Sequence, residues 1–135
     1  MSTQRTSAVL VREPFTIDRL DRIRDVVRRA ATKVGLSLAR AERFITAVSE
    51  AVANAIQHGG GRGQLELVQL GHTALIARIV DQGPGMPALG PIRRPPATAI
   101  GGRGRWIMRE YSDRLDYPAC PTGTTVELGM NLSTA

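Results

Sequence analysis

Apolar positions recur at helical spacing along two successive segments in the first half of the chain. In residues 20–34 they come every three or four positions, and arginines occupy the other face. Asp18 is the expected N-cap of this helix and Gly35 its expected end. Ser37 then caps a second helix that continues to about His58. The apolar stripe of the second helix consists of Phe44, Ile45, Val48, Val52 and Ile56.

Apolar and alternating segments predict strands on both sides of these helices. Residues 8–11 and 15–17 are two apolar segments, so we expect a strand or a bent strand that Pro14 interrupts and that lies at the edge of a sheet. Residues 64–70 and 74–80 flank a Gly-His-Thr turn and predict a hairpin, whose second strand is apolar enough for a central position. The remaining expected elements are a long loop up to residue 100, a short helix over 105–111, and strands over 114–117 and 124–130.

The predicted elements follow the order β-α-α-β-β-loop-α-β-β. Because helices and hairpins are segregated along the chain, we expect an α+β two-layer sandwich, in which helices cover one face of a mixed, mostly antiparallel sheet. The length of 135 residues suits one domain over residues 1–135 with one core. Residues 1–7 are polar and are expected to be flexible.

The composition favours a cytoplasmic protein. No apolar segment approaches the roughly 20 residues of a membrane span, and no secretory signal is recognisable near the N-terminus. The single cysteine, Cys120, cannot form an intrachain disulfide, which is typical of a reducing compartment. We therefore expect no association with a membrane.

The net charge of +6 comes almost entirely from arginine, since Lys33 is the only lysine. A basic protein has nucleic acid, nucleotide phosphates or an acidic protein as its possible partners. The arginines are spread from Arg5 to Arg114 and the few aromatic residues are scattered, which argues against a surface for single-stranded nucleic acid. No Gly-x-x-x-x-Gly pattern precedes Lys33, so a Walker-type phosphate loop is excluded.

One face of the second helix carries a row of polar residues. Glu50, Asn54 and His58 follow one another at intervals of four, so their side chains stack along one face. Asn54 offers a hard oxygen to Mg²⁺, which takes few protein ligands, and Glu50 is placed to accept a proton. Taken alone, such a row is more often only a solvated face. A histidine at a helix end, as at His58, more often caps carbonyl groups.

Three glycine-containing motifs follow this row. They are Asp81-Gln82-Gly83-Pro84-Gly85, Gly102-Arg103-Gly104 and Gly123-Thr124-Thr125. A carboxylate at a strand end accepts a hydrogen bond from an exocyclic amine such as that of adenine, and glycines let a flat ring approach the backbone. Glycines before a helix free backbone N–H groups for phosphates. Each motif alone is a common turn sequence, whereas their joint order is much more specific.

With these motifs the chain resembles the GHKL ATPase and kinase superfamily, which has the Bergerat ATP-binding fold. More narrowly, it resembles the bacterial anti-sigma-factor serine/threonine kinases and related switch kinases. Residues 46–59 resemble the N box of that family. The resemblance implies ATP and Mg²⁺ as cofactors, Glu50 as general base, Asn54 as metal ligand and residues 86–101 as an ATP lid. The implied nucleotide-binding residues are Asn54, His58, Asp81, Gly83, Gly85, Gly102, Arg103, Gly104, Arg105, Thr124 and Thr125.

The resemblance also implies an activity and partners. Members transfer the γ-phosphoryl group of ATP to a STAS-domain anti-anti-sigma protein, and many hold a sigma factor inactive while they are homodimers. An alternative is an ATP-sensing partner-switch regulator that binds its partner without phosphorylating it. A third possibility, an arginine-rich nucleic-acid binder, predicts affinity that falls steeply with salt. The sequence departs from the family at Arg105, where many members have an aliphatic residue, and in a proline-rich lid whose only charges are Arg93 and Arg94.

Overall fold

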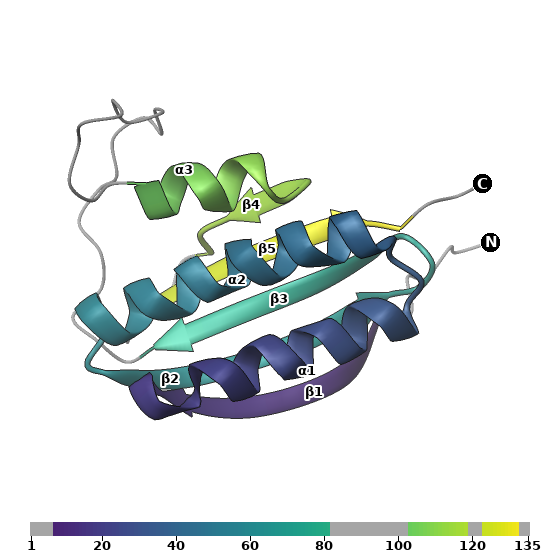
Figure 1. Ribbon diagram of the computed structural model, residues 1–135. Helices are drawn as coiled ribbons and strands as arrows, with labels where there is room; N and C mark the ends of the chain where they lie inside the picture. The colour runs from purple at the N-terminus through teal and green to yellow at the C-terminus, as the bar shows by residue number, and fades with distance from the viewer. Residues whose placement is uncertain (1–6, 82–102, 119–122, 133–135) are drawn as a thin grey trace.

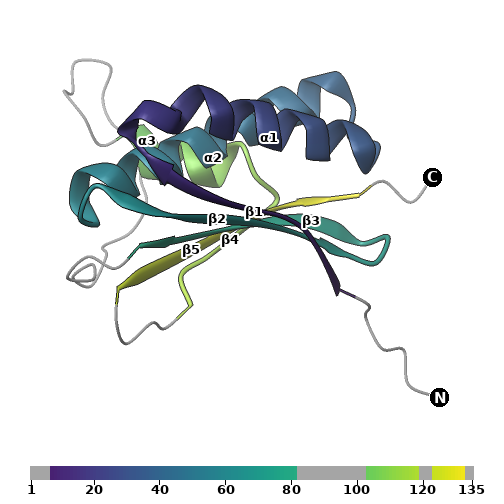
Figure 2. The ribbon, with the colours of Figure 1, turned by 90° about the horizontal axis from the view of Figure 1, so that it is seen from below.

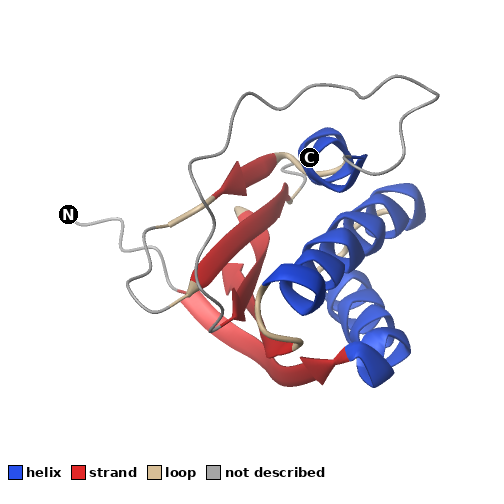
Figure 3. Ribbon diagram, turned by 90° about the vertical axis from the view of Figure 1, so that its left-hand side faces the viewer, coloured by secondary structure: helices blue, strands red, loops and turns tan. Residues whose placement is uncertain are grey.

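A computed structural model describes residues 7–81, 103–118 and 123–132. The strands are β1 (Ser7–Thr16), β2 (Arg62–Leu70), β3 (Ala74–Asp81), β4 (Arg114–Asp116) and β5 (Thr124–Asn131), and the α-helices are α1 (Leu20–Lys33), α2 (Leu38–His58) and α3 (Arg103–Glu110). These strands form one sheet in the order β1-β2-β3-β5-β4, and every pairing between them is antiparallel. The helices lie on one face of the sheet, with α2 between α1 and α3 (Figures 1 and 3). The predicted α+β architecture is confirmed.

The core lies between the helices and the inner face of the sheet, which the edge-on view shows as two layers (Figure 2). The predicted apolar stripe of α2 supplies much of it, because Phe44, Val48 and Val52 are fully buried. Leu67 of β2 and Leu75 of β3 are buried from the sheet side. Burial of each large apolar side chain stabilises the fold by about 1.5–3 kcal/mol relative to exposure.

Strand β1 is continuous, so the expected interruption at Pro14 is wrong. Pro14 pairs with Gln64, and the register shifts between Val9 and Val11 instead. A proline is tolerated here because β1 is an edge strand, where a missing N–H donor leaves no neighbouring strand unsatisfied. The predicted edge position of β1 and the central position of β3 are both confirmed.

The sequence predicted four helix boundaries, at Asp18, Gly35, Ser37 and His58, and all but the one at Asp18 are confirmed. Ser37 Oγ accepts a hydrogen bond from the backbone N–H of Arg40 at 3.2 Å, which confirms the predicted cap of α2. Gly35 ends α1 with a φ of 88°, a conformation that favours glycine. The N-cap of α1 is Arg19 rather than Asp18, because a short 3₁₀ turn over Ile17–Arg19 precedes the helix.

Helix α3 begins two residues earlier than predicted, at Arg103, so Gly104 lies inside its first turn. Trp106 is a large aromatic residue at helical spacing, which predicts a place in the core. This prediction is wrong: the Trp106 side chain is only partly buried, and Met108 is the buried residue of α3. Because α3 lies at the end of the helix layer, only one side of it faces the core (Figure 3).

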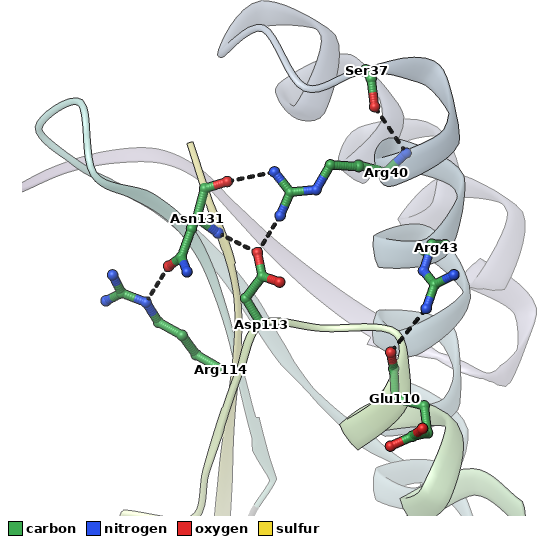
Figure 4. Close-up of polar contacts among 7 residues, drawn as sticks. All are labelled: Ser37, Arg40, Arg43, Glu110, Asp113, Arg114 and Asn131. Carbon is green, nitrogen blue, oxygen red and sulfur yellow. Dashed lines mark hydrogen bonds and ion pairs between the residues drawn. The ribbon is translucent and has the colours of Figure 1, made fainter. Parts of the chain in front are cut away.

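The turn between α3 and β4 is tied to α2 and β5 by a polar network (Figure 4). The Arg40 guanidinium donates hydrogen bonds to the Asp113 carboxylate and, at 2.7 Å, to the Asn131 carbonyl oxygen. Asp113 also accepts the backbone N–H of Asn131 at 2.8 Å. One helix turn further on, Arg43 donates to the Glu110 carbonyl oxygen at 3.0 Å. These contacts join α2, α3 and β5 to the turn before β4.

The outer face of the sheet carries a row of alternating charges. Arg12 Nε lies 2.8 Å from Glu66, Glu66 lies 3.1 Å from Arg78, and Arg78 Nε lies 2.7 Å from Glu127. The row thus crosses β1, β2, β3 and β5 in order. None of the described helices covers this face (Figure 2). Within the described ranges, no helix combines the length and the apolar character that crossing a bilayer requires.

Candidate functional site

The polar row of α2 faces α3. Glu50 and Asn54 are half-buried, and His58 is exposed at the end of the helix. Their intervals of four residues keep them on one side, while Val48 and Val52 occupy the buried side. The helix therefore presents the predicted row to the space between α2 and α3.

Gly104, in the first turn of α3, lies directly against this row. A methyl group at Gly104 would lie 3.0 Å from Glu50 Oε2 and 3.7 Å from Asn54 Oδ1. The carboxylate and the amide therefore converge on one point beside the α3 backbone. Glu50 and Asn54, which lie 50 or more positions before Gly104 in the sequence, thus come together with it.

Asp81 is buried at the end of β3, with 5% of its surface exposed. The buried positions Leu75, Ala77 and Ile79 alternate along β3, and Asp81 continues the series on the helix side. Among the residues that the structure describes, Asp81 is the only buried polar or charged one. Because desolvation of a carboxylate is costly, its position inside the fold makes Asp81 a functional candidate.

Gly59 makes room for this carboxyl group. A methyl group at Gly59 would lie 2.3 Å from Asp81 Cγ and 2.6 Å from the Ala55 carbonyl oxygen, so no larger residue fits without displacement. The backbone N–H of Gly59 donates to that same carbonyl oxygen at 2.7 Å and closes α2. The end of α2 is thus packed onto the end of β3.

A pocket opens between α2, α3 and the ends of β3 and β5. The described residues that line it are Ala51, Asn54, Ala55, His58, Ile79, Asp81, Arg105, Met108, Tyr117, Thr124 and Val126. Five predicted site residues, Asn54, His58, Asp81, Arg105 and Thr124, are thereby brought together. The pocket combines apolar walls with a few polar groups that converge on it.

The register of β5 distinguishes between the two threonines of the last motif. Thr124 pairs with Asp81, and Val126 pairs with Ile79. Since alternate residues of a strand share a face, Thr124 lies on the pocket side with Val126, and Thr125 lies on the outer side. The sequence prediction named both residues, and only Thr124 lines the pocket.

The other predicted site residues have different positions. Arg103 is exposed in the first turn of α3 and does not line the pocket. Glu50 does not line the pocket either; it lies against Gly104. His58 lines the pocket and makes no hydrogen bond to the described residues, so the alternative of a carbonyl-capping histidine lacks support. The predictions at Gly83, Gly85, Gly102, the lid over 86–101 with Arg93 and Arg94, and Cys120 lie outside the described residues.

Six residues of the pocket lining were not predicted as site residues: Ala51, Ala55, Ile79, Met108, Tyr117 and Val126. Ile79 and Met108 form part of its apolar wall, and Tyr117 enters it from the residue after β4. Ile79 was recognisable as the residue two positions before Asp81 on the same face of its strand. Tyr117 carried no comparable signal, because its place depends on the pairing of β4 beside β5.

Comparison with known proteins agrees with this geometry. Residues 14–130 match a family described as the histidine kinase-like ATPase domain. Two sequences named anti-sigma F factor, both from Bacillus licheniformis, are each 37% identical to the chain over 98 residues, which cover 65% of this chain and 67% of the relative. The chain therefore belongs to the histidine kinase-like ATPase family, and the resemblance to the anti-sigma-factor kinases of the GHKL superfamily is confirmed.

A solved structure supports the fold independently. The crystal structure of the RsbU and RsbW domains of a Mycobacterium tuberculosis protein superposes with a TM-score of 0.65 over 93% of this chain, at 18% identity. This chain spans about a third of that protein, since the match covers 33% of its length. The likeness therefore concerns the architecture described above.

Proposed function

We propose that this protein is an ATP-dependent serine/threonine kinase that acts as an anti-sigma factor and phosphorylates a STAS-domain anti-anti-sigma protein. The observation that carries the proposal is the convergence of Glu50 and Asn54 on Gly104, beside a pocket that contains a buried carboxyl group. Membership of an ATPase family and the similarity to proteins named anti-sigma F factor also support this proposal.

In this proposal the pocket holds the adenosine part of ATP. The Asp81 carboxylate accepts a hydrogen bond from the adenine amine, and Thr124 assists from the adjacent strand. Ile79 and Met108 provide apolar surface for the ring. The phosphates then extend towards the first turn of α3, where Arg105 brings a positive charge to the pocket.

The row of α2 carries the chemistry in this proposal. Mg²⁺ usually takes one or two oxygen ligands from the protein and the rest from water and phosphate, and the Asn54 amide oxygen beside Glu50 fits that requirement. A bound Mg²⁺ would neutralise charge on the phosphates. Glu50 takes the proton of the attacking hydroxyl, whose oxygen bonds to the γ-phosphorus while the bond to the bridging oxygen breaks and ADP leaves.

Labelled ATP with Mg²⁺ and candidate STAS-domain proteins provides the direct test. The wild-type chain should label its partner. Glu50→Ala should still bind ATP, but its labelling rate should fall by at least about 100-fold, because a general base contributes on that order. Glu42→Ala is the matched control, since Glu42 is exposed on the same helix and away from the pocket. Undiminished labelling by Glu50→Ala would contradict the role given to Glu50.

ATP binding itself has a separate test. Asp81→Asn should lose ATP affinity in equilibrium titration, because the amide places a donor where the adenine amine needs an acceptor. The sigma factor and the homodimer belong to the same proposal, and co-purification of a partner that ATP releases would support it. Binding and release of a partner without any labelling would favour the alternative, an ATP-sensing partner-switch regulator without kinase activity.

A further inference from the structure

The hydroxyl group of Tyr117 is buried and has no hydrogen-bond partner among the residues that the structure describes. The ring itself is half-buried and packs against the core. Leu115 and Tyr117 lie on the helix side of β4, while Asp116 between them is exposed. The backbone N–H of Tyr117 donates to Asp116 Oδ1 at 2.9 Å, which fixes the backbone where the side chain turns inwards.

The Tyr117 side chain forms part of the wall of the pocket that Asp81 and Thr124 also line. In the sheet order β3-β5-β4, Tyr117 lies across β5 from Asp81. Asp116 pairs with Glu127, so Tyr117 follows at the level of Val126, further into the pocket than Thr124. Asp81 and Tyr117 therefore approach the pocket from different sides.

A buried hydroxyl without a partner destabilises the free protein, because the group has lost water and gained nothing in return. A phenylalanine would fill the same space without that cost. We infer that the Tyr117 hydroxyl is a binding group for the nucleotide and that it forms its hydrogen bond with the adenosine part of the ligand, directly or through one bridging water. This inference rests on the proposed function of the pocket as an ATP site.

The surroundings of Tyr117 indicate the adenosine part rather than the phosphates. Met108 and Val126, which line the pocket with it, are 1% and 7% exposed and are apolar. A neutral hydroxyl among apolar side chains suits a flat heterocycle, whose ring nitrogens offer acceptors. The charged Glu50 and the glycine backbone at Gly104, in contrast, form the separate cluster beside the first turn of α3.

Tyr117→Phe tests the inference, because it removes only the oxygen and keeps the ring that packs against the core. The chain has two tyrosines, and Tyr111→Phe is the matched control. The Tyr111 ring lies 4.7 Å from the Arg43 guanidinium and outside the pocket lining. Isothermal titration of both variants with ATP and with ADP, in the presence of Mg²⁺, gives the affinities.

We expect Tyr117→Phe to bind ATP about three- to tenfold more weakly than the wild type, which is the usual size of one hydrogen bond. The same factor should hold for ADP, because the lost contact is to the part that both ligands share. Tyr111→Phe should bind like the wild type. Without nucleotide, the melting temperature of Tyr117→Phe should equal or exceed that of the wild type, a combination that a purely structural hydroxyl would not give.

Two outcomes separate the failure of this inference from that of the proposed function. Wild-type affinity in Tyr117→Phe, with ATP binding by the wild-type chain intact, would overturn the inference alone. A lower melting temperature of nucleotide-free Tyr117→Phe would overturn it as well, since the hydroxyl would then have a partner within the protein. Absence of ATP binding by the wild-type chain would overturn the proposed function and this inference together.

Discussion

Gly59 lies so close to Asp81 that a single added methyl group would overlap the buried carboxyl group at 2.3 Å. The φ of Gly59 is −111°, which any residue adopts, so the contact alone requires glycine. We expect Gly59→Ala to displace the carboxyl group and to weaken ATP binding about tenfold or more, because loss of a hydrogen bond to a charged group costs about 1.5–3 kcal/mol. Isothermal titration with ATP measures the loss.

Gly60 provides the control for this substitution. Its φ is 90° and nothing lies within 4 Å of an added methyl group. Gly60→Ala should therefore lower the free energy of unfolding by about 1–2 kcal/mol through backbone strain and leave ATP affinity unchanged. Equal ATP affinities in the two variants would show that the contact between Gly59 and Asp81 does not affect ATP binding.

Gly104→Ala should separate stability from catalysis. Alanine is the better residue inside a helix by roughly 0.5–1 kcal/mol, so the free energy of unfolding should not fall. The added methyl group lies 3.0 Å from Glu50 Oε2, however, and must push that carboxylate aside. We expect phosphoryl transfer to slow about tenfold or more, because catalysis is sensitive to sub-ångström displacement of a catalytic group.

A second measurement checks that this effect acts through Glu50. In a chain that already carries Glu50→Ala, the addition of Gly104→Ala should slow transfer little further, since the displaced group is absent. Urea unfolding and transfer of labelled phosphate provide the two readouts. A Gly104→Ala chain with the wild-type transfer rate would rule out the contact as a constraint on catalysis.

The contact between Arg40 and Asp113 should contribute more to stability than an ordinary surface ion pair. Both side chains are about one-third exposed, at 35% and 34%, and both also bond to the backbone of Asn131. We expect a coupling energy of about 1 kcal/mol in a double-mutant cycle with alanine, measured by urea unfolding.

The pair formed by Arg28 and Glu42 offers a matched comparison. These side chains are 47% and 51% exposed and lie 3.5 Å apart. Exposed pairs with such geometry contribute little, so their coupling should stay below about 0.5 kcal/mol. Equal coupling energies for the two pairs would mean that the backbone contacts of Arg40 and Asp113 add nothing.

The charged row on the outer face of the sheet predicts unequal effects of its two arginines. Arg78 contacts two carboxylates, Glu66 and Glu127, whereas Arg12 contacts Glu66 alone and is 62% exposed. Arg78→Ala should therefore destabilise the protein by roughly 0.5–1 kcal/mol more than Arg12→Ala. The difference should shrink in 1 M NaCl, where the Debye length is about 3 Å, and a difference that persists there would point to packing instead.

The sequence predicted those parts of the fold that depend on local spacing. The helical period placed Glu50 and Asn54 on one face of α2, and Ser37 marked the start of that helix. The same period could not decide the role of Trp106, because the burial of a side chain on α3 depends on which side of that helix meets the core. Size alone favoured burial of the tryptophan, and Met108 is buried instead.

Contacts between distant strands were less accessible to prediction. The choice of Thr124 over Thr125 required the pairing of Thr124 with Asp81, which no local pattern contains. Tyr117 depends in the same way on the pairing of β4 with β5. The motifs therefore identified which segments form the site, while the register of the sheet determined which side chains of those segments enter the pocket.

The network at Asp113 has a consequence for local unfolding. The segment from α3 to β4 is held at its middle by Arg40 and Asn131, while Gly104 and Tyr117 lie towards its two ends at the candidate site. Strand β4 pairs with β5 over three positions, so few backbone hydrogen bonds hold it. Amide hydrogens of this segment should therefore exchange before those of the hairpin of β2 and β3. Bound nucleotide should slow exchange at both ends of the segment at once. Hydrogen exchange at this weakly held edge of the sheet would then report whether nucleotide is bound.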